Sequence, residues 1–178
     1  MKTNLTKKQV SQLTKNGKKE PRFKGGSMEG LLYEPSKNKL TATNGHGLIT
    51  YIVESDLNDS NGILPIELFK SKISDSCTYE INGSAKRVNN NEISTYNLIE
   101  AEYPDYESVI PLIDNKFEVG INLDLLKKLC DAVPKDNDSN RNVKLTFDVD
   151  NNKSAIKFEQ LSSDVNYSGL IMPVRLSD

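Results

Sequence analysis

One pattern recurs three times in this chain: a helical segment is followed by three segments in which apolar and polar residues alternate. The third helix, "NLDLLKKLCDAV", is the clearest, because its apolar residues recur at the i, i+3, i+4, i+7 spacing of one helix face: Leu126, Leu129, Cys130 and Val133. Pro134 is expected to end it. The first helix is predicted in "NLTKKQVSQLTKNG". The second is predicted in "LPIELFKSKISD", with a buried apolar stripe formed by Leu68, Phe69 and Ile73.

Short alternating strands follow each helix. They are "GLLYEP", "KLTATNG" and "LITYIVE", then "TYEING", "SAKRVNN" and "ISTYNLIE", then "VKLTFDV", "SAIKFEQ" and "GLIMPVRL". A short apolar segment, residues 62–64 or 117–121, precedes each of the last two helices, so the repeating unit is β-α-β-β-β. The helix starts "PIELFK" and "NLDLLK" align at an offset of 57 residues. A repeat of this kind buries its helix and sheet by stacking on its neighbours.

The sequence therefore predicts an α+β fold with antiparallel sheets and amphipathic helices on one face. With 36% hydrophobic and 27% charged residues, its sheets should keep one face in water. No apolar run is long enough to span a bilayer, so no membrane association is expected. Cys77 and Cys130 are too few for a disulfide framework, which favours a reducing compartment and a cytoplasmic protein.

Charge is distributed unevenly along the chain. Residues 1–24 contain eight basic side chains and one acid, a net charge of +7, whereas the remainder has 15 basic and 24 acidic residues, a net charge of −9. A basic patch on an acidic body suits a protein that meets phosphates on one face. The alternative is a solvated, lysine-rich segment without a partner.

The common catalytic and metal motifs are absent from the sequence: it has no GxxxxGK[ST], GxSxG, HExxH or paired CxxC, and only one histidine. The segment "DVDNNKSAIKFE" places Asp148, Asp150, Asn152 and Glu159 at positions 1, 3, 5 and 12 of a calcium loop. Lys153 stands where that loop needs glycine, and its flanks alternate as strands. We therefore predict a polar hairpin turn, with no metal and no cofactor.

Three stretches remain, "TATNGHGL", "YPDYESVIP" and "LIMPVRL". Each combines apolar residues with Pro, Gly or His at a strand end, as expected of a surface that grips a peptide. In the same order and at compatible spacing they resemble the motifs of the bacterial DNA sliding clamp, the beta subunit of DNA polymerase III.

The resemblance implies a clamp-like fold. Clamps of that family have six β-α-β-β-β units in three domains, and two chains close a ring around DNA. Residues 1–111 resemble the middle domain, and residues 112–178 resemble the C-terminal half of the last domain. The chain thus resembles a clamp shortened to about one and a half domains, for which we expect a homo-oligomer.

In the family, polymerases dock through a short peptide in a groove. The matching positions here are Met28, Thr43, Gly45, His46, Leu48, Pro104, Val109, Leu170, Met172, Pro173, Val174, Arg175 and Leu176. By this resemblance the His46 ring packs against the peptide, whereas without it His46 would be a plain turn residue. Ser108 stands where the family commonly has arginine, which departs from the pattern of polar contacts.

The resemblance implies a non-enzymatic processivity factor that tethers a polymerase or another replication or repair protein to double-stranded DNA without reading its sequence. Its further partner would be a clamp loader. The expected DNA-facing residues are lysines of the first and third helices: Lys7, Lys8, Lys15, Lys127 and Lys128. The alternative is a clamp-derived module that binds clamp-binding peptides without encircling DNA. An enzyme is a third, weaker hypothesis, because the sequence carries none of the common catalytic motifs.

Overall fold

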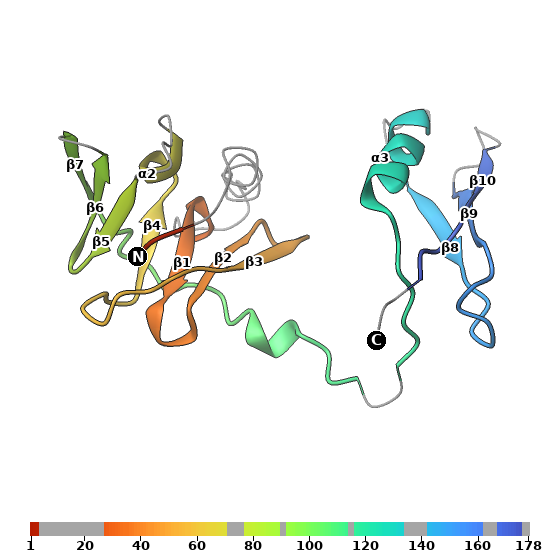
Figure 1. Cartoon of the computed structure of the whole chain (residues 1–178), viewed down its shortest axis with the longest axis horizontal. Coiled ribbons are helices and arrows are strands. Elements are labelled where there is room, and N and C mark those ends of the chain that lie inside the picture. Colours follow the sequence, from red (N-terminus) through yellow and green to blue (C-terminus); the bar gives the residue numbers. More distant parts are fainter. Residues whose placement is uncertain are drawn as a thin grey trace. The chain divides into compact units, whose positions relative to one another are not determined.

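The computed structural model describes residues 1–3, 27–70, 77–89, 92–113, 116–133, 142–161 and 167–175. The chain divides into two compact units, Met1–Ile110 and Pro111–Asp178 (Figure 1). That these two units correspond to the middle domain and half of the last domain of a clamp stays a prediction. The first predicted helix, with Lys7, Lys8 and Lys15, lies outside the described residues, as does Leu176.

The first unit contains two of the repeats. The first repeat comprises short 3₁₀ turns and three strands: η1 (Ser27–Glu29), β1 (Gly30–Glu34), η2 (Pro35–Lys37), β2 (Lys39–Thr43) and β3 (Leu48–Ile52). The second comprises β4 (Gly62–Pro65), α2 (Glu67–Lys70), β5 (Thr78–Ile81), β6 (Ser84–Asn89) and β7 (Glu92–Asn97), followed by η3 (Glu107–Val109). The predicted strands of both repeats are therefore confirmed.

The two repeats are joined by exchanging their lead-in segments. The β4 strand precedes α2 but pairs antiparallel with β1 of the other repeat, with Leu32 opposite Ile63, so that one sheet has the order β3-β2-β1-β4. Lys2 in turn bridges Thr78 of β5. Strands β5, β6 and β7 form a second antiparallel sheet.

One hydrophobic core serves both repeats. Leu31, Tyr33 and Leu40 of the first repeat lie in the same buried cluster as Leu68 and Tyr79 of the second, and each is at most 1% exposed. The burial of Leu68 and Phe69 confirms the apolar stripe predicted for the second helix, and Ile73 lies outside the described residues. Neither repeat buries its apolar residues alone.

The second unit contains one repeat. Its elements are α3 (Leu123–Ala132), β8 (Val143–Thr146), β9 (Ile156–Gln160) and β10 (Ser168–Ile171), with the sheet order β10-β9-β8. Asn122 begins the helix, because its side-chain oxygen accepts hydrogen bonds from the backbone N–H groups of Asp124 and Leu125. The third predicted helix is thus confirmed. Of its predicted apolar face, Val133 is buried and Leu126 half-buried, but Cys130 is exposed.

The calcium-loop alternative fails in this unit, because β8 and β9 pair antiparallel, with Leu145 opposite Phe158. The flanks are strands and not the helices that such a loop requires. The Asp148 carboxylate instead holds the turn, accepting hydrogen bonds from the Asp150 N–H at 3.2 Å and the Ser154 hydroxyl at 3.0 Å. The predicted polar hairpin turn is confirmed.

Candidate functional site

The turn between β2 and β3 carries the only histidine of the chain and is fixed by its own side chains. The Thr43 hydroxyl donates to the Gly47 carbonyl at 2.8 Å and accepts from the Gly45 N–H at 3.1 Å. The Asn44 side-chain oxygen accepts from the N–H groups of His46 and Gly47 at 3.0 and 2.9 Å. Gly45 has a φ of 83°, which an L side chain adopts only with strain.

These hydrogen bonds fix the backbone conformation of the turn. The side chains of Asn44 and Thr43 are turned to its own backbone, whereas His46 is exposed and Leu48 is 37% exposed at the start of β3. Two other predicted groove residues contribute little surface, since Met28 and Thr43 are 6% and 8% exposed. In this turn, His46 and Leu48 are therefore the side chains available to a ligand.

The "YPDYESVIP" segment is anchored to the first sheet by two tyrosines. The Tyr103 hydroxyl donates to the Thr41 carbonyl at 3.3 Å, and burial raises the pKa of Tyr103 to about 12. The Tyr106 hydroxyl donates to the Glu34 carboxylate at 2.6 Å. Burial alone would raise the pKa of Glu34, but hydrogen bonds from Lys37 and Tyr106 hold it below its ordinary value. The segment is thus tied to both β1 and β2.

Because the two tyrosines anchor this segment, its predicted groove residues remain exposed on the protein surface. Pro104 is exposed and Val109, in η3, is 74% exposed. Ser108 is also exposed, and its hydroxyl donates to the Asp105 carbonyl at 2.8 Å. Sequence reasoning missed the two anchors, although tyrosines three residues apart in "YPDYESVIP" could have indicated them.

The predicted residues of the second unit follow β10. Ile171 is buried, whereas Leu170, Met172 and Val174 are 64%, 61% and 45% exposed. The Val174 N–H donates to the Gly120 carbonyl at 2.9 Å, which ties the tail to the segment that leads into α3. Pro173 lies two residues beyond the end of β10 and has no N–H to donate to a continued strand.

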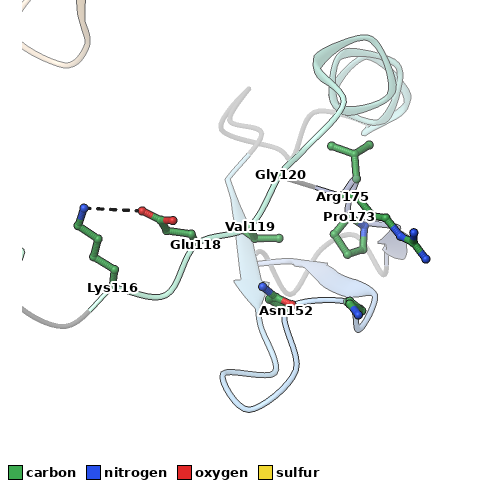
Figure 2. A pocket seen from close by; sticks show the side chains of 9 residues that line it. Lys116, Glu118, Val119, Gly120, Asn152, Pro173 and Arg175 are labelled. Atoms are coloured by element: carbon green, nitrogen blue, oxygen red, sulfur yellow. Dashed lines mark ion pairs between the residues drawn. The ribbon is translucent and has the colours of Figure 1, made fainter. Parts of the chain in front are cut away.

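A groove of about 730 Å³ lies beside this tail, and Figure 2 shows its lining. Pro173, Val174 and Arg175 line it, as predicted residues, together with Lys116, Glu118, Val119, Gly120, Asn152 and Lys153. Glu118 and Lys116 form an ion pair at 3.8 Å. Lys116, Lys153 and Arg175 give the groove a positive balance over Glu118, and the sequence did not predict the first two of these as site residues.

The predicted DNA-facing lysines within the described residues lie on α3. Lys127 and Lys128 are exposed, but Lys127 forms an ion pair with Asp131 at 2.6 Å. The hydrogen bond to Asp131 raises the pKa of Lys127. Half of the positive charge that these two lysines offer to a phosphate is therefore already neutralised on the helix.

Two negative findings concern the described residues alone. They contain no group of three or more His, Cys, Asp or Glu side chains placed to hold a metal ion. None of the helices in this part of the chain has the length and apolar character that a bilayer span requires.

Comparison of the whole fold with solved structures finds bacterial clamps. The DNA polymerase III subunit beta of Borrelia burgdorferi, in complex with a natural product, matches with a TM-score of 0.66 and 23% identity over 93% of this chain and 44% of that chain. The chain has the fold of a bacterial DNA sliding clamp. The predicted α+β clamp fold is thus confirmed.

Other clamps agree. The C. crescentus beta sliding clamp matches with a TM-score of 0.67 and 19% identity, covering 95% of this chain and 49% of that chain. The Helicobacter pylori beta clamp bound to a DNA ligase peptide matches with a TM-score of 0.59 and 20% identity, covering 92% and 47%. The chain spans about half the length of these clamps. No protein-family model and no curated protein matches the sequence.

Proposed function

We propose that this chain is a non-enzymatic, clamp-like tether that holds a polymerase or another replication or repair protein on double-stranded DNA. The clamp fold over nearly its whole length is the observation that carries the proposal. Two of the matched clamps have a ligand bound: the Helicobacter pylori clamp a DNA ligase peptide, and the Bartonella birtlesii clamp griselimycin. A partner that carries a clamp-binding peptide is the first expectation for this chain.

The predicted groove residues, taken within each unit separately, are proposed as contacts for such a peptide. In the first unit these are Met28, Thr43, Gly45, His46, Leu48, Pro104 and Val109, of which Met28 and Thr43 are buried. In the second unit they are the residues of the tail: Leu170, Met172, Pro173, Val174, Arg175 and Leu176. Two features support this assignment. The exposed residues of the set are mostly apolar, and hydrogen bonds hold the backbone that carries them in place.

Fluorescence polarisation with a labelled peptide that carries a polymerase clamp-binding motif tests the site. Peptide binding is mostly apolar burial at a few anchors, so Met172→Ala should cost on the order of 2 kcal/mol, more than tenfold in affinity. Val109→Ala should weaken binding as well. The matched control is Leu57→Ala, because Leu57 is fully exposed in the first unit and lies outside the proposed site.

Equal affinity in Met172→Ala, Val109→Ala and the wild type would reject the site. Removing residues from Val174 onward should also abolish binding, but that truncation deletes the hydrogen bond from Val174 to Gly120. Circular dichroism of each variant must therefore show an intact fold before a loss of affinity is assigned to the peptide contacts.

DNA binding is proposed to be independent of sequence and weakened by salt, through Lys7, Lys8, Lys15, Lys127 and Lys128. Each phosphate contact removed should reduce the salt slope by roughly one unit. Lys128→Ala should therefore reduce the slope more than Lys127→Ala, because Asp131 already pairs with Lys127. Changing Lys7, Lys8 and Lys15 together with no change of slope would leave the basic segment without a DNA role.

A second candidate is a peptide-binding module that competes for clamp-binding motifs without encircling DNA. The ion pair of Lys127 with Asp131 and the sequence pI of about 5.6 favour it. Peptide affinity with no salt-sensitive DNA affinity would select this candidate over the tether. A clamp loader is proposed with the first candidate alone, whereas a cytoplasmic location and a homo-oligomer are proposed under either candidate.

A further inference from the structure

In the part of the chain that the structure describes, the second unit lacks strand pairs that close the first unit. In the first unit the lead-in strand β4 has two neighbours, since Ile63 bridges Ile99 of its own repeat and β4 also pairs with β1 of the other repeat. In the second unit Gly120 bridges Val174 of its own repeat in the same way. Among the described residues, no strand pairs with the other edge of residues 119–121 or with the outer edge of β8.

Apolar side chains at the start of α3 are also exposed to solvent. At the offset of 57 residues, Leu123 and Leu125 correspond to Ile66 and Leu68 of the first unit. Ile66 and Leu68 are 7% and 0% exposed, whereas Leu123 and Leu125 are 75% and 45% exposed. Ile66 and Leu68 belong to a core that contains residues of both repeats, so a second repeat is what covers this face.

A cavity of about 170 Å³ lies further along the helix, between α3 and the sheet of its own unit. Leu126, Leu129 and Val133 of α3 line it together with residues of the sheet, among them Val143 and Leu145. Leu145 is 44% exposed although it faces the helix. Exposed apolar side chains at the start of α3, a cavity between helix and sheet, and two strand edges without a partner describe a repeat that has no complement within the described residues.

We propose that a second copy of this chain supplies that complement, in a two-fold symmetric dimer of second units. The segment 119–122 of one copy would pair with β8 of the other, as β4 pairs with β1 within the first unit. A two-fold axis forms this pairing twice, so that both free edges of both copies are used. The proposal deepens the homo-oligomer named above, of which it specifies the surface, and it rests on that part of the proposed function alone.

The first unit also fixes the expected register. Leu32 is the outward residue of β1 that lies opposite Ile63. Its counterpart on β8 is Lys144, because Val143 and Leu145 on either side face the cavity. Gly120 of one copy then lies opposite Lys144 of the other, and Val119 lies opposite Leu145, as Gly62 lies opposite Tyr33.

Charge complementarity favours this occupant. In the expected register, Glu118 of one copy is the diagonal neighbour of Lys144 of the other, a separation that long side chains span. Glu118 and Lys144 are exposed in the single chain, where they pair with Lys116 at 3.8 Å and with Glu159 at 3.1 Å, so the contact between copies would add to or replace these exposed ion pairs. One copy therefore presents an acid where the other presents a base, and the two-fold axis doubles the contact.

Sedimentation velocity of the full chain gives the first test. The wild type should be a dimer at micromolar concentration, and Leu123→Lys with Leu125→Lys should be a monomer of unchanged circular dichroism, because both side chains are exposed within one unit. The matched control is Leu57→Lys with Ile93→Lys, two exposed apolar residues of the first unit, which should remain a dimer. A monomeric wild type, or a dimer that survives the Leu123 and Leu125 changes, would overturn the proposal.

Disulfide trapping tests the register. In a Cys130→Ser background, Val119→Cys and Leu145→Cys are purified separately, mixed and oxidised. A cross-linked dimer should accumulate in the mixture well above the level in either variant alone, and a mixture of Leu57→Cys with Leu145→Cys should give none beyond that level. Equal cross-linking in the two mixtures would reject the pairing of residues 119–122 with β8.

The peptide titration described above separates the two proposals. The Leu123→Lys and Leu125→Lys variant changes no residue of the proposed peptide site. Loss of the dimer with retained peptide affinity would support this interface beside the tether function. A wild-type chain that binds peptide as a monomer would reject the interface and leave the peptide site standing.

Discussion

The two units carry the same repeat in different surroundings. Where Leu68 of the first unit is fully buried, its counterpart Leu125 in the second unit is 45% exposed. Both residues lie on an amphipathic helix that follows a lead-in segment, and their sequence patterns match. The difference shows that helix amphipathicity sets which residues can be buried, whereas a neighbouring repeat decides whether they are.

The largest expected effect is a pair of matched truncations at these positions. Leu68→Ala removes a fully buried side chain and should lower the free energy of unfolding by about 3 kcal/mol. Leu125→Ala should cost about 1 kcal/mol or less when the chain is dilute enough to be monomeric. Urea unfolding followed by far-ultraviolet circular dichroism measures both, since the chain has no tryptophan. Equal losses of unfolding free energy in the two variants would show that Leu68 and Leu125 are buried to the same extent in solution.

An intermediate effect concerns Asp59, a buried carboxylate of the first unit. It accepts hydrogen bonds from the Tyr33 hydroxyl at 2.7 Å and the Ile81 N–H at 3.0 Å, and it forms an ion pair with the Met1 amine at 2.6 Å. Asp59→Asn should lower the free energy of unfolding by about 2 kcal/mol at neutral pH. Asp148→Asn is the matched control in the second unit, where the carboxylate holds an exposed turn and the loss should be smaller.

The pH dependence sharpens the same test. Burial alone would raise the pKa of Asp59, but the Met1 amine and the Tyr33 hydroxyl hold it below its ordinary value of 3.8. A carboxyl whose folded pKa is depressed stabilises the fold above its unfolded pKa, and this contribution disappears as the pH falls through the folded pKa. The difference in stability between wild type and Asp59→Asn should therefore shrink below about pH 4. A difference that persists in acid would mean that the charge of Asp59 contributes little.

The smallest effect separates two glycines of the β2–β3 turn. Gly45→Ala should lower the free energy of unfolding by about 1 kcal/mol, because φ at this position is 83°. Gly47→Ala should be close to neutral, since an added Cβ would meet only the Asn44 side-chain oxygen, at 4.0 Å. Thermal unfolding measures both variants. A neutral Gly45→Ala would show that the turn of the first unit is as tolerant as an ordinary exposed loop.

Local patterns predicted most elements of the fold. Period-2 alternation gave the strands of both units, and the apolar spacing in "NLDLLKKLCDAV" gave α3. The hairpin at Asp148 followed from a lysine where a calcium loop needs glycine. These predictions succeeded because backbone pairing and helix faces depend on residues near one another in the chain.

The site was less accessible to such reasoning. Pro104 and Val109 are exposed because Tyr103 and Tyr106 tie their segment to Thr41 and Glu34, more than 60 residues away along the chain. The groove beside the second-unit tail joins Lys116 and Asn152 to Pro173. No local pattern in the sequence connects those three positions, so only folding brings them together.

The sequence by itself determined the repeat, its helix faces and the order of its strands, because each depends on spacings within a few residues. The tertiary structure decided which repeat pairs its strand edges with those of another repeat. Ile63 reaches a strand of another repeat, whereas Gly120 bridges a residue of its own repeat only, among the described residues. Strand pairing between repeats depends on the availability of a complementary edge, and the residues of one repeat do not encode whether that edge is present.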